Sequence, residues 1–198
     1  MSKLQESPIQ KLHPTQLTVG MIEVEEKIRH LSKLEAHEKR EFMQAHPVPA
    51  VIGPTGSLYI TDHHHLARAA FEAGVSTGFF EVEVDLSSQD LDSFWKEMDR
   101  RSLVHPLDEY GVRHHYSLIP HHVGKLIDDV YRSLAGYVRA AGGYDKTPAA
   151  FAEFEWADFF RRLIAIEDLR ADFQAAVSAA VLLARSDRAK SMPGYKGK

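Results

Sequence analysis

Four consecutive ionisable residues, Asp62 to His65, follow the short apolar run Leu58-Tyr59-Ile60 after the single residue Thr61. The run is typical of a buried strand, and small and apolar residues then recur at helical spacing up to Gly74. The pattern therefore predicts a strand-to-helix junction, with a helix over 63–73. A helix N-terminus presents unpaired N–H groups and the positive end of the helix dipole, so this junction favours an anion such as phosphate.

The residue types at this junction support several kinds of chemistry. A carboxylate at Asp62 can ligate Mg²⁺ or accept a proton, and the imidazoles can move protons or stabilise charge. Asp62 also suits the N-cap position, where its side chain would accept a backbone N–H, and capping is compatible with catalysis. Histidine is a mediocre helix former, so three histidines in succession indicate a use for at least one of them.

A zinc site made from these histidines is a poorer interpretation. Adjacent residues of a helix project about 100° apart, so they cannot all reach one ion. A site that pairs His64 with Arg68, or His65 with a residue of the segment 105–122, is geometrically easier to form than one that uses all three histidines. All twelve histidines lie between His13 and His122, so any imidazole chemistry belongs to this part of the chain.

The segments around the junction predict the elements that position it. A short strand and turn are expected in 8–20, and a helix over 23–46 with a break near its middle, ended by Pro47. The stretch 48–61 predicts a hairpin whose second arm delivers Asp62. Period-two alternation over 79–86 predicts a half-exposed strand with Phe80, Val82, Val84 and Leu86 on one face and Phe79, Glu81, Glu83 and Asp85 on the other.

A helix capped by Ser87 or Ser88 follows, and the rest of the chain predicts helices. One begins near Leu126 and ends at Gly142-Gly143. The aromatic residues of 150–165 are interpreted as core, with nucleotide stacking as the alternative. The predicted fold class is α+β, a small mixed sheet with helices followed by an all-helical C-terminal half. The predicted domains are 1–122, a helical extension over 123–190, and a flexible tail over 191–198.

Composition limits the class of protein. The 198 residues include 44% hydrophobic and 26% charged residues, with a net charge of −4, which indicates a globular chain without overall attraction to nucleic acid. The chain contains no cysteine, which excludes disulfides and thiolate chemistry. No apolar run is long enough to cross a membrane, and the polar start lacks a signal-peptide core. A cytoplasmic location is expected. The alternative that a leader peptide was trimmed from the sequence stays open.

The stretch Thr61-Asp62-His63-His64-His65-Leu66-Ala67-Arg68-Ala69 resembles the ParB-like nuclease family, within the ParB/sulfiredoxin superfamily. The likeness covers most of the chain. Other blocks that carry it are Pro14-Thr15-Gln16, Pro49-Ala50-Val51-Ile52-Gly53-Pro54, Asp129-Val130-Tyr131-Arg132-Ser133-Leu134-Ala135 and Phe151-Ala152-Glu153-Phe154-Glu155-Trp156-Ala157-Asp158.

The resemblance implies a nucleotide as ligand or substrate. In that superfamily the strand-to-helix element binds nucleotide phosphates: partition proteins use CTP, sulfiredoxin uses ATP, and a free-serine kinase uses ADP. The kinase carries Asp-Gly-His-His-Arg, which places Asp62, His64 and His65 on its acid and its two histidines. His63 here replaces the glycine. His64 also occupies the position of the sulfiredoxin cysteine, so sulfiredoxin chemistry is excluded.

The remaining implied residues are phosphate ligands and a second carboxylate. Leu66 stands where those relatives have arginine. Arg68, two residues later, is the candidate for the missing phosphate contact, although on a helix it points about 160° away from Leu66. The kinase also has an essential glutamate before the junction, for which Glu25 or Glu23 is the nearest candidate, with Lys27 close by. The alternative for these acids is a favourable first helical turn. Together with His63, Arg68 and Lys27 are the predicted phosphate ligands.

Two hypotheses of different class follow. In the first, Asp62 with Glu25 or Glu23 holds Mg²⁺ or another divalent cation on a phosphate ester, while His64 or His65 stabilises charge or moves a proton in phosphoryl transfer or phosphodiester hydrolysis. In the second, the chain binds a nucleotide, or DNA, without turnover, and its C-terminal helices form a homodimer or partner surface. The acidic balance of the chain does not favour nucleic acid.

Overall fold

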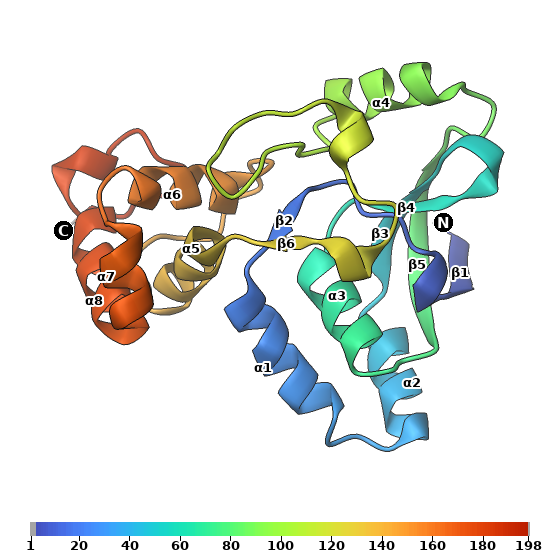
Figure 1. The fold of residues 1–198 in the computed structure, drawn as a ribbon, viewed down its shortest axis with the longest axis horizontal. Coiled ribbons are helices and arrows are strands. Elements are labelled where there is room, and N and C mark those ends of the chain that lie inside the picture. Colours follow the sequence, from blue (N-terminus) through green and yellow to red (C-terminus); the bar gives the residue numbers. More distant parts are fainter. Residues whose placement is uncertain (1–2, 198) are drawn as a thin grey trace. The chain divides into compact units, whose positions relative to one another are not determined.

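The protein is an α+β chain, described here in a computed structural model over residues 3–197 (Figure 1). Residues 1, 2 and 198, which belong to the predicted first domain and tail, lie outside the described part. The chain divides into two compact units. The first extends to Ile127, and the second comprises the residues from Asp128 onward together with segments 20–22 and 109–111.

The first unit contains a four-stranded mixed sheet in the order β1-β5-β3-β4. The strand β5 pairs antiparallel with β1 and parallel with β3, and β3 pairs antiparallel with β4. This confirms the predicted hairpin, which turns through a short 3₁₀ segment. The strands are β1 (Lys3–Pro8), β3 (Val48–Ile52), β4 (Leu58–Ile60) and β5 (Thr77–Asp85).

The predicted strand in 8–20 was only partly right. The edge strand β1 ends at Pro8, and the segment 8–20 holds the short strand β2 (Thr18–Val19) instead. Leu17 beside this strand accepts a hydrogen bond from Ile127 N–H at 2.9 Å. Pairing partners so far apart in sequence leave no local pattern, which explains the error. The other short elements are β6 (Ile127–Asp128) and the 3₁₀ turns η1 (Ile9–Lys11), η2 (Pro54–Gly56), η3 (Tyr116–Leu118) and η4 (Val123–Lys125).

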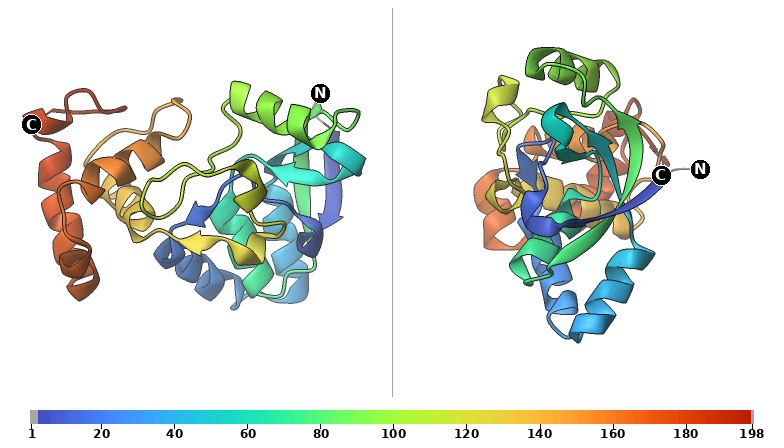
Figure 2. Two further views of the ribbon diagram at one scale, coloured as in Figure 1. Left: turned by 45° about the horizontal axis from the view of Figure 1, so that its top comes forward. Right: turned by 90° about the vertical axis from the view of Figure 1, so that its right-hand side faces the viewer.

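The predicted 23–46 helix is two helices, α1 (Met21–Leu31) and α2 (Ala36–Ala45), so the break near its middle is confirmed. The break is stabilised by a reciprocal capping box between Glu35 and Glu38. Within the first unit, α2 lies near one end of the sheet and α4 (Leu91–Arg100) near the other (Figures 1 and 2). The cap of α4 is Asp90, which accepts Ser93 N–H at 2.9 Å, so the prediction of Ser87 or Ser88 was wrong.

The core of the first unit explains how β5 is covered. Phe80 and Leu86 are buried and the acidic residues alternate outward, as the period-two pattern predicts. Phe79 was expected on the exposed face but is buried, and the Arg40 guanidinium lies 5.1 Å from its ring centroid. A buried cluster next to the hairpin joins the sheet to α4; its members are Leu17, Val51, Tyr59, Leu86, Phe94, Trp95, Met98, Val104 and Ile119.

The second unit is helical and contains α5 (Val130–Ala140), α6 (Ala152–Arg161), α7 (Ile166–Ala171), α8 (Phe173–Ala184) and the turn η5 (Asp187–Ala189). Its aromatic residues form the core, with the Tyr144 and Trp156 rings stacked at 4.3 Å. Trp156 Nε1 donates to the Pro193 carbonyl at 2.8 Å, so part of the predicted tail packs on this unit. Among residues 3–197, no helix is long and apolar enough to span a bilayer.

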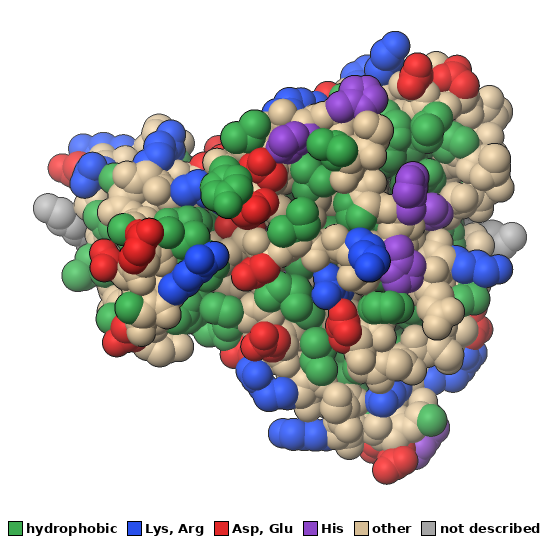
Figure 3. Space-filling view, in the orientation of Figure 1, with side chains coloured by type: hydrophobic (Ala, Val, Ile, Leu, Met, Phe, Trp, Pro, Cys, Tyr) green, Lys and Arg blue, Asp and Glu red, His purple; other side chains and the backbone are tan. Residues whose placement is uncertain are grey.

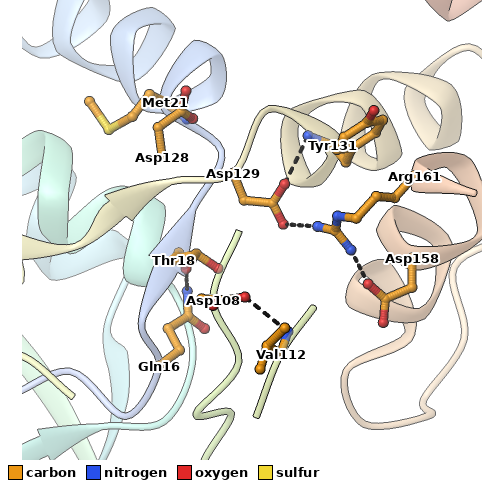
Figure 4. Close-up of polar contacts among 10 residues, drawn as sticks. All are labelled: Gln16, Thr18, Met21, Asp108, Val112, Asp128, Asp129, Tyr131, Asp158 and Arg161. Carbon is orange, nitrogen blue, oxygen red and sulfur yellow. Dashed lines mark hydrogen bonds and ion pairs between the residues drawn. The ribbon is translucent and has the colours of Figure 1, made fainter. Parts of the chain in front are cut away.

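A buried carboxylate sets the start of α5. Asp129 caps this helix by accepting Tyr131 N–H at 3.0 Å, so the helix begins at Val130 and not near Leu126 as predicted. Its second oxygen accepts from Arg161 at 2.7 Å, and Arg161 also pairs with Asp158 (Figure 4). Burial raises the pKa of Asp129 despite the neighbouring guanidinium. One side chain therefore joins the start of α5 to the end of α6.

Replacing Asp129 with asparagine separates its contribution as the N-cap of α5 from its contribution as the partner of Arg161. Asparagine retains the cap but leaves the partly buried Arg161 without one of its two carboxylates, so Asp129→Asn is expected to lower the free energy of unfolding by about 2 kcal/mol or more. The matched control is Asp172→Asn at the exposed cap of α8, which should change it by less than about 0.5 kcal/mol. Urea denaturation measures both, and equal effects would contradict the role of the ion pair.

Candidate functional site

The junction between β4 and α3 (His64–Glu72) is made by three residues, Thr61, Asp62 and His63. His63 has φ 57° and ψ 28°, in the left-handed region that L-residues rarely adopt. This single conformation turns the chain from strand into helix and makes His63 the N-cap. The resemblance placed His63 where relatives have glycine, and a left-handed residue explains why glycine suits that position.

Asp62 is therefore not the N-cap, and this part of the prediction was wrong. Its Oδ1 accepts the N–H of the adjacent His63 at 2.6 Å, and both side chains are exposed. The carboxylate thus lies just before the helix, where the positive end of the dipole favours negative charge. The neighbouring Thr61 hydroxyl donates to Glu83 at 3.2 Å, which ties the junction to β5.

His64 and His65 are buried, unlike Asp62 and His63. His64 Nε2 accepts the backbone N–H of Thr15 at 3.1 Å. A backbone N–H can only donate, so Nε2 carries a lone pair and the imidazole is neutral with its proton on Nδ1. The Thr15 hydroxyl in turn donates to the Ile60 carbonyl at 2.9 Å. These contacts favour a positioning role for His64, which holds the segment around Thr15 against the junction.

Arg68 makes its contacts within the fold. Its Nε donates to Glu72 at 2.9 Å, and its Nη1 donates to the Leu126 carbonyl at 2.8 Å. Only 14% of the Arg68 side chain is exposed. A phosphate would have to compete with a carboxylate one helical turn away. The predicted phosphate contact from Arg68 therefore has to break an existing ion pair.

Glu25 and Lys27 are exposed on α1, in the same unit as the junction. Within residues 3–197, neither side chain forms an ion pair or hydrogen bond with the ionisable residues of the junction. Their predicted catalytic and phosphate-binding roles stay predictions. The structure thus brings Asp62 and His63 together at the surface, with His64 and His65 behind them.

The described residues do not form a metal site by themselves. Between residues 3 and 197, no group of three or more histidine, aspartate or glutamate side chains is arranged to hold an ion. Asp62 offers a single carboxylate. Such a carboxylate fits only a cation that takes most of its ligands from water and a bound phosphate, as Mg²⁺ commonly does.

Thr15 is the residue of this site that the sequence did not predict as functional. It is nearly fully buried and is joined to both β4 and α3 through its backbone N–H and its hydroxyl. The only sequence signal was the block Pro14-Thr15-Gln16, since no local periodicity links a loop residue to a helix that begins 49 positions later.

The family model described as ParB-like nuclease matches residues 5–162. The chain belongs to the ParB-like nuclease family. The match extends from β1 through α6, so it includes the junction and most of the first unit. A comparison with curated proteins found no match.

Two solved structures are similar to this member of the ParB-like nuclease family. The first is the crystal structure of protein Atu1540 from Agrobacterium tumefaciens, whose sequence is 40% identical. The match covers 100% of the present chain and 98% of the Atu1540 chain, with a TM-score of 0.93. The C-terminally truncated chromosome-partitioning protein ParB from Caulobacter crescentus, complexed with CTP-gamma-S, is 13% identical over 94% of both chains, with a TM-score of 0.34. The second similarity is too low to establish a shared fold or ligand.

The left-handed conformation of His63 generates a stability prediction. Glycine adopts this conformation without the Cβ penalty, so His63→Gly is expected to raise the free energy of unfolding by about 0.5–1 kcal/mol. The control is Glu41→Gly, at an exposed helical position of α2, which should lower it by about 1 kcal/mol. Thermal denaturation compares the two, and a destabilised His63→Gly variant would contradict a left-handed backbone at this position.

Proposed function

We propose that the chain binds a phosphate ester, specifically the phosphate groups of a nucleotide, at the β4–α3 junction formed by residues 61–65. The observation that carries this proposal is the left-handed turn at His63, which leaves Asp62 and His63 exposed at the N-terminus of α3. The helix dipole there favours an anion, and the exposed imidazole of His63 adds a side-chain N–H donor. Membership of the ParB-like nuclease family supports a phosphate-containing ligand.

In this proposal the four ionisable residues have different roles. His63 donates to a phosphate oxygen, and Asp62 binds a divalent cation that accompanies the phosphate. His64 keeps the helix start against Thr15, and the buried His65 lies behind the same turn. Arg68 orients α3 through Glu72 and Leu126 rather than binding the ligand.

Metal-dependent phosphoryl transfer or phosphodiester hydrolysis is the second candidate function. It is favoured by the exposed carboxylate of Asp62, since either reaction needs a group that can hold a cation or take a proton at the phosphate. Against it, His64 Nε2 is engaged with Thr15, and among the described residues no group of three or more acidic or histidine side chains is arranged to hold a cation. Binding without turnover is therefore the stronger candidate.

A thermal-shift screen tests binding directly. Nucleoside mono-, di- and triphosphates are added with and without Mg²⁺ or Mn²⁺, and a ligand at one hundred times its dissociation constant should stabilise the protein by about 2.7 kcal/mol. Product analysis of the same mixtures detects any hydrolysis. The absence of stabilisation by every nucleotide and by inorganic phosphate would contradict the proposal.

Substitution of Asp62 tests the role of its charge. An asparagine side-chain oxygen can still accept the His63 N–H, so Asp62→Asn should melt within a degree or two of the parent, as a change of about 0.5 kcal/mol or less implies. The variant is expected to lose the metal-dependent part of the ligand-induced shift. Asp92→Asn, at an exposed residue in the first turn of α4, is the matched control and should keep it. An undiminished shift in Asp62→Asn would exclude this residue from the site.

A further inference from the structure

Two histidine rings from segments that are far apart in the sequence, His13 and His121, meet beside β4 in the first unit, and His122 is close enough to act electrostatically on His13. His13 precedes Thr15, and His121 and His122 lie just before η4; these three residues are called the imidazole group below. The His13 and His121 rings meet edge to face at 6.4 Å, with an interplanar angle of 85°. Figure 3 shows histidine side chains gathered on the face of this unit that carries η4, next to lysine or arginine side chains.

Backbone hydrogen bonds and ring contacts hold the imidazole group in place. His13 N–H donates to the Leu58 carbonyl at 3.0 Å, and the His13 carbonyl accepts from Ile60 N–H at 2.9 Å. Its ring stacks on Tyr59 at 4.8 Å. The His122 ring packs edge to face on Phe71 of α3 at 4.5 Å. His13 is therefore held by the sheet and His122 by α3, and the exposed His121 ring packs against His13.

The charges that these rings can carry all have the same sign. Burial lowers the pKa of His13 first, and then His121 and His122 lower it further by repulsion. Among the described residues, the titratable groups with ring contacts to His13 are His121 and Tyr59; Tyr59 is neutral near neutral pH, and burial raises its pKa still further. An anion bound between the rings would offset this repulsion by attracting each positive charge.

The tautomer of His122 distinguishes between an anion and a metal. Gly124 N–H donates to His122 Nδ1 at 3.0 Å, so Nδ1 provides the lone pair and the neutral ring carries its proton on Nε2. Nε2 is then an N–H donor, whose hydrogen bond an oxyanion can accept, whereas a metal ion needs the lone pair of an unprotonated nitrogen. The described residues accordingly contain no group of three side chains arranged to hold a metal.

We propose that His13, His121 and His122 form a binding site for a tetrahedral oxyanion, the phosphate or sulfate group of a ligand, separate from the β4–α3 junction. His122 donates through Nε2 without needing a charge, and the exposed His121 and the half-buried His13 add further ring N–H donors. The site requires no metal and no nucleotide at Asp62. It therefore stands or fails independently of the function proposed above.

Sulfate is the first probe, because it stays doubly charged between about pH 6 and about pH 8, so only the protein titrates in that range. At constant ionic strength the parent should bind sulfate more tightly at the lower pH. His121→Gln is expected to weaken binding at least about tenfold, the loss of one charge-assisted hydrogen bond. The matched control His37→Gln, at an exposed histidine of α2, should bind like the parent.

Further variants and direct observation distinguish the outcomes. If His63→Gln abolishes sulfate binding and His121→Gln does not, the anion lies at the junction and the proposal fails, while the function proposed above gains support. Imidazole resonances of His121 and His122 that shift with sulfate, in heteronuclear NMR spectra of the parent, would support the site even if a variant unfolds. The absence of such shifts, or parent-like affinity in His121→Gln, overturns it.

The same titration with inorganic phosphate and with a nucleoside monophosphate identifies the source of the anion. Equal affinities assign the site to the free ion. A nucleotide that binds about tenfold or more tightly than phosphate assigns it to the phosphate group of a larger ligand, since the additional contacts must come from the nucleoside. Failure of both to bind contradicts the proposal.

Discussion

The hydrogen bond from the Thr15 backbone to His64 Nε2 is the interaction on which the first unit depends. It is buried, and it connects the loop before β2 to the first residue of α3. The Thr15 hydroxyl adds a second contact to the last residue of β4. An unpaired buried donor costs about 1–3 kcal/mol, so this small set of contacts strongly favours one arrangement of loop, strand and helix. The neutral imidazole that it requires makes His64 part of the scaffold.

That scaffold makes a strained backbone at His63 tolerable. A left-handed L-residue costs roughly 1–2 kcal/mol, which is acceptable only where neighbouring contacts determine the path of the chain. Because the turn occurs in one residue, the buried pair His64 and His65 faces the core while Asp62 and His63 face the solvent. The motif is thus divided into a buried half with a structural role and an exposed half. The exposed half, at the start of α3, is the surface suited to an anion.

The second unit is held together by different interactions. Its core is aromatic and aliphatic, but the start of α5 and the end of α6 are joined by an ion pair between the buried Asp129 and the partly buried Arg161. Arg132 and Arg139 both pair with Glu153 in the same helical unit. Since a buried ion pair stabilises little in net terms but is costly to break, these residues specify which helix faces meet more than they add to stability.

The sequence by itself determined the elements whose signals are local. Proline and glycine marked the hairpin, periodicity marked the interrupted helix over 23–46 and the strand β5, and the motif at Asp62 to His65 identified both the junction and the family. These features depend on neighbours within a few positions, so they can be read from one chain. The tertiary structure alone decided how the motif is used: that His63 and not Asp62 is the cap, that His64 bonds to Thr15, and that Arg68 is held by Glu72 and Leu126. It also brought His13 to His121. Such contacts join residues whose separation along the chain bears no relation to any period, because they arise only when strand pairing and burial bring distant segments together.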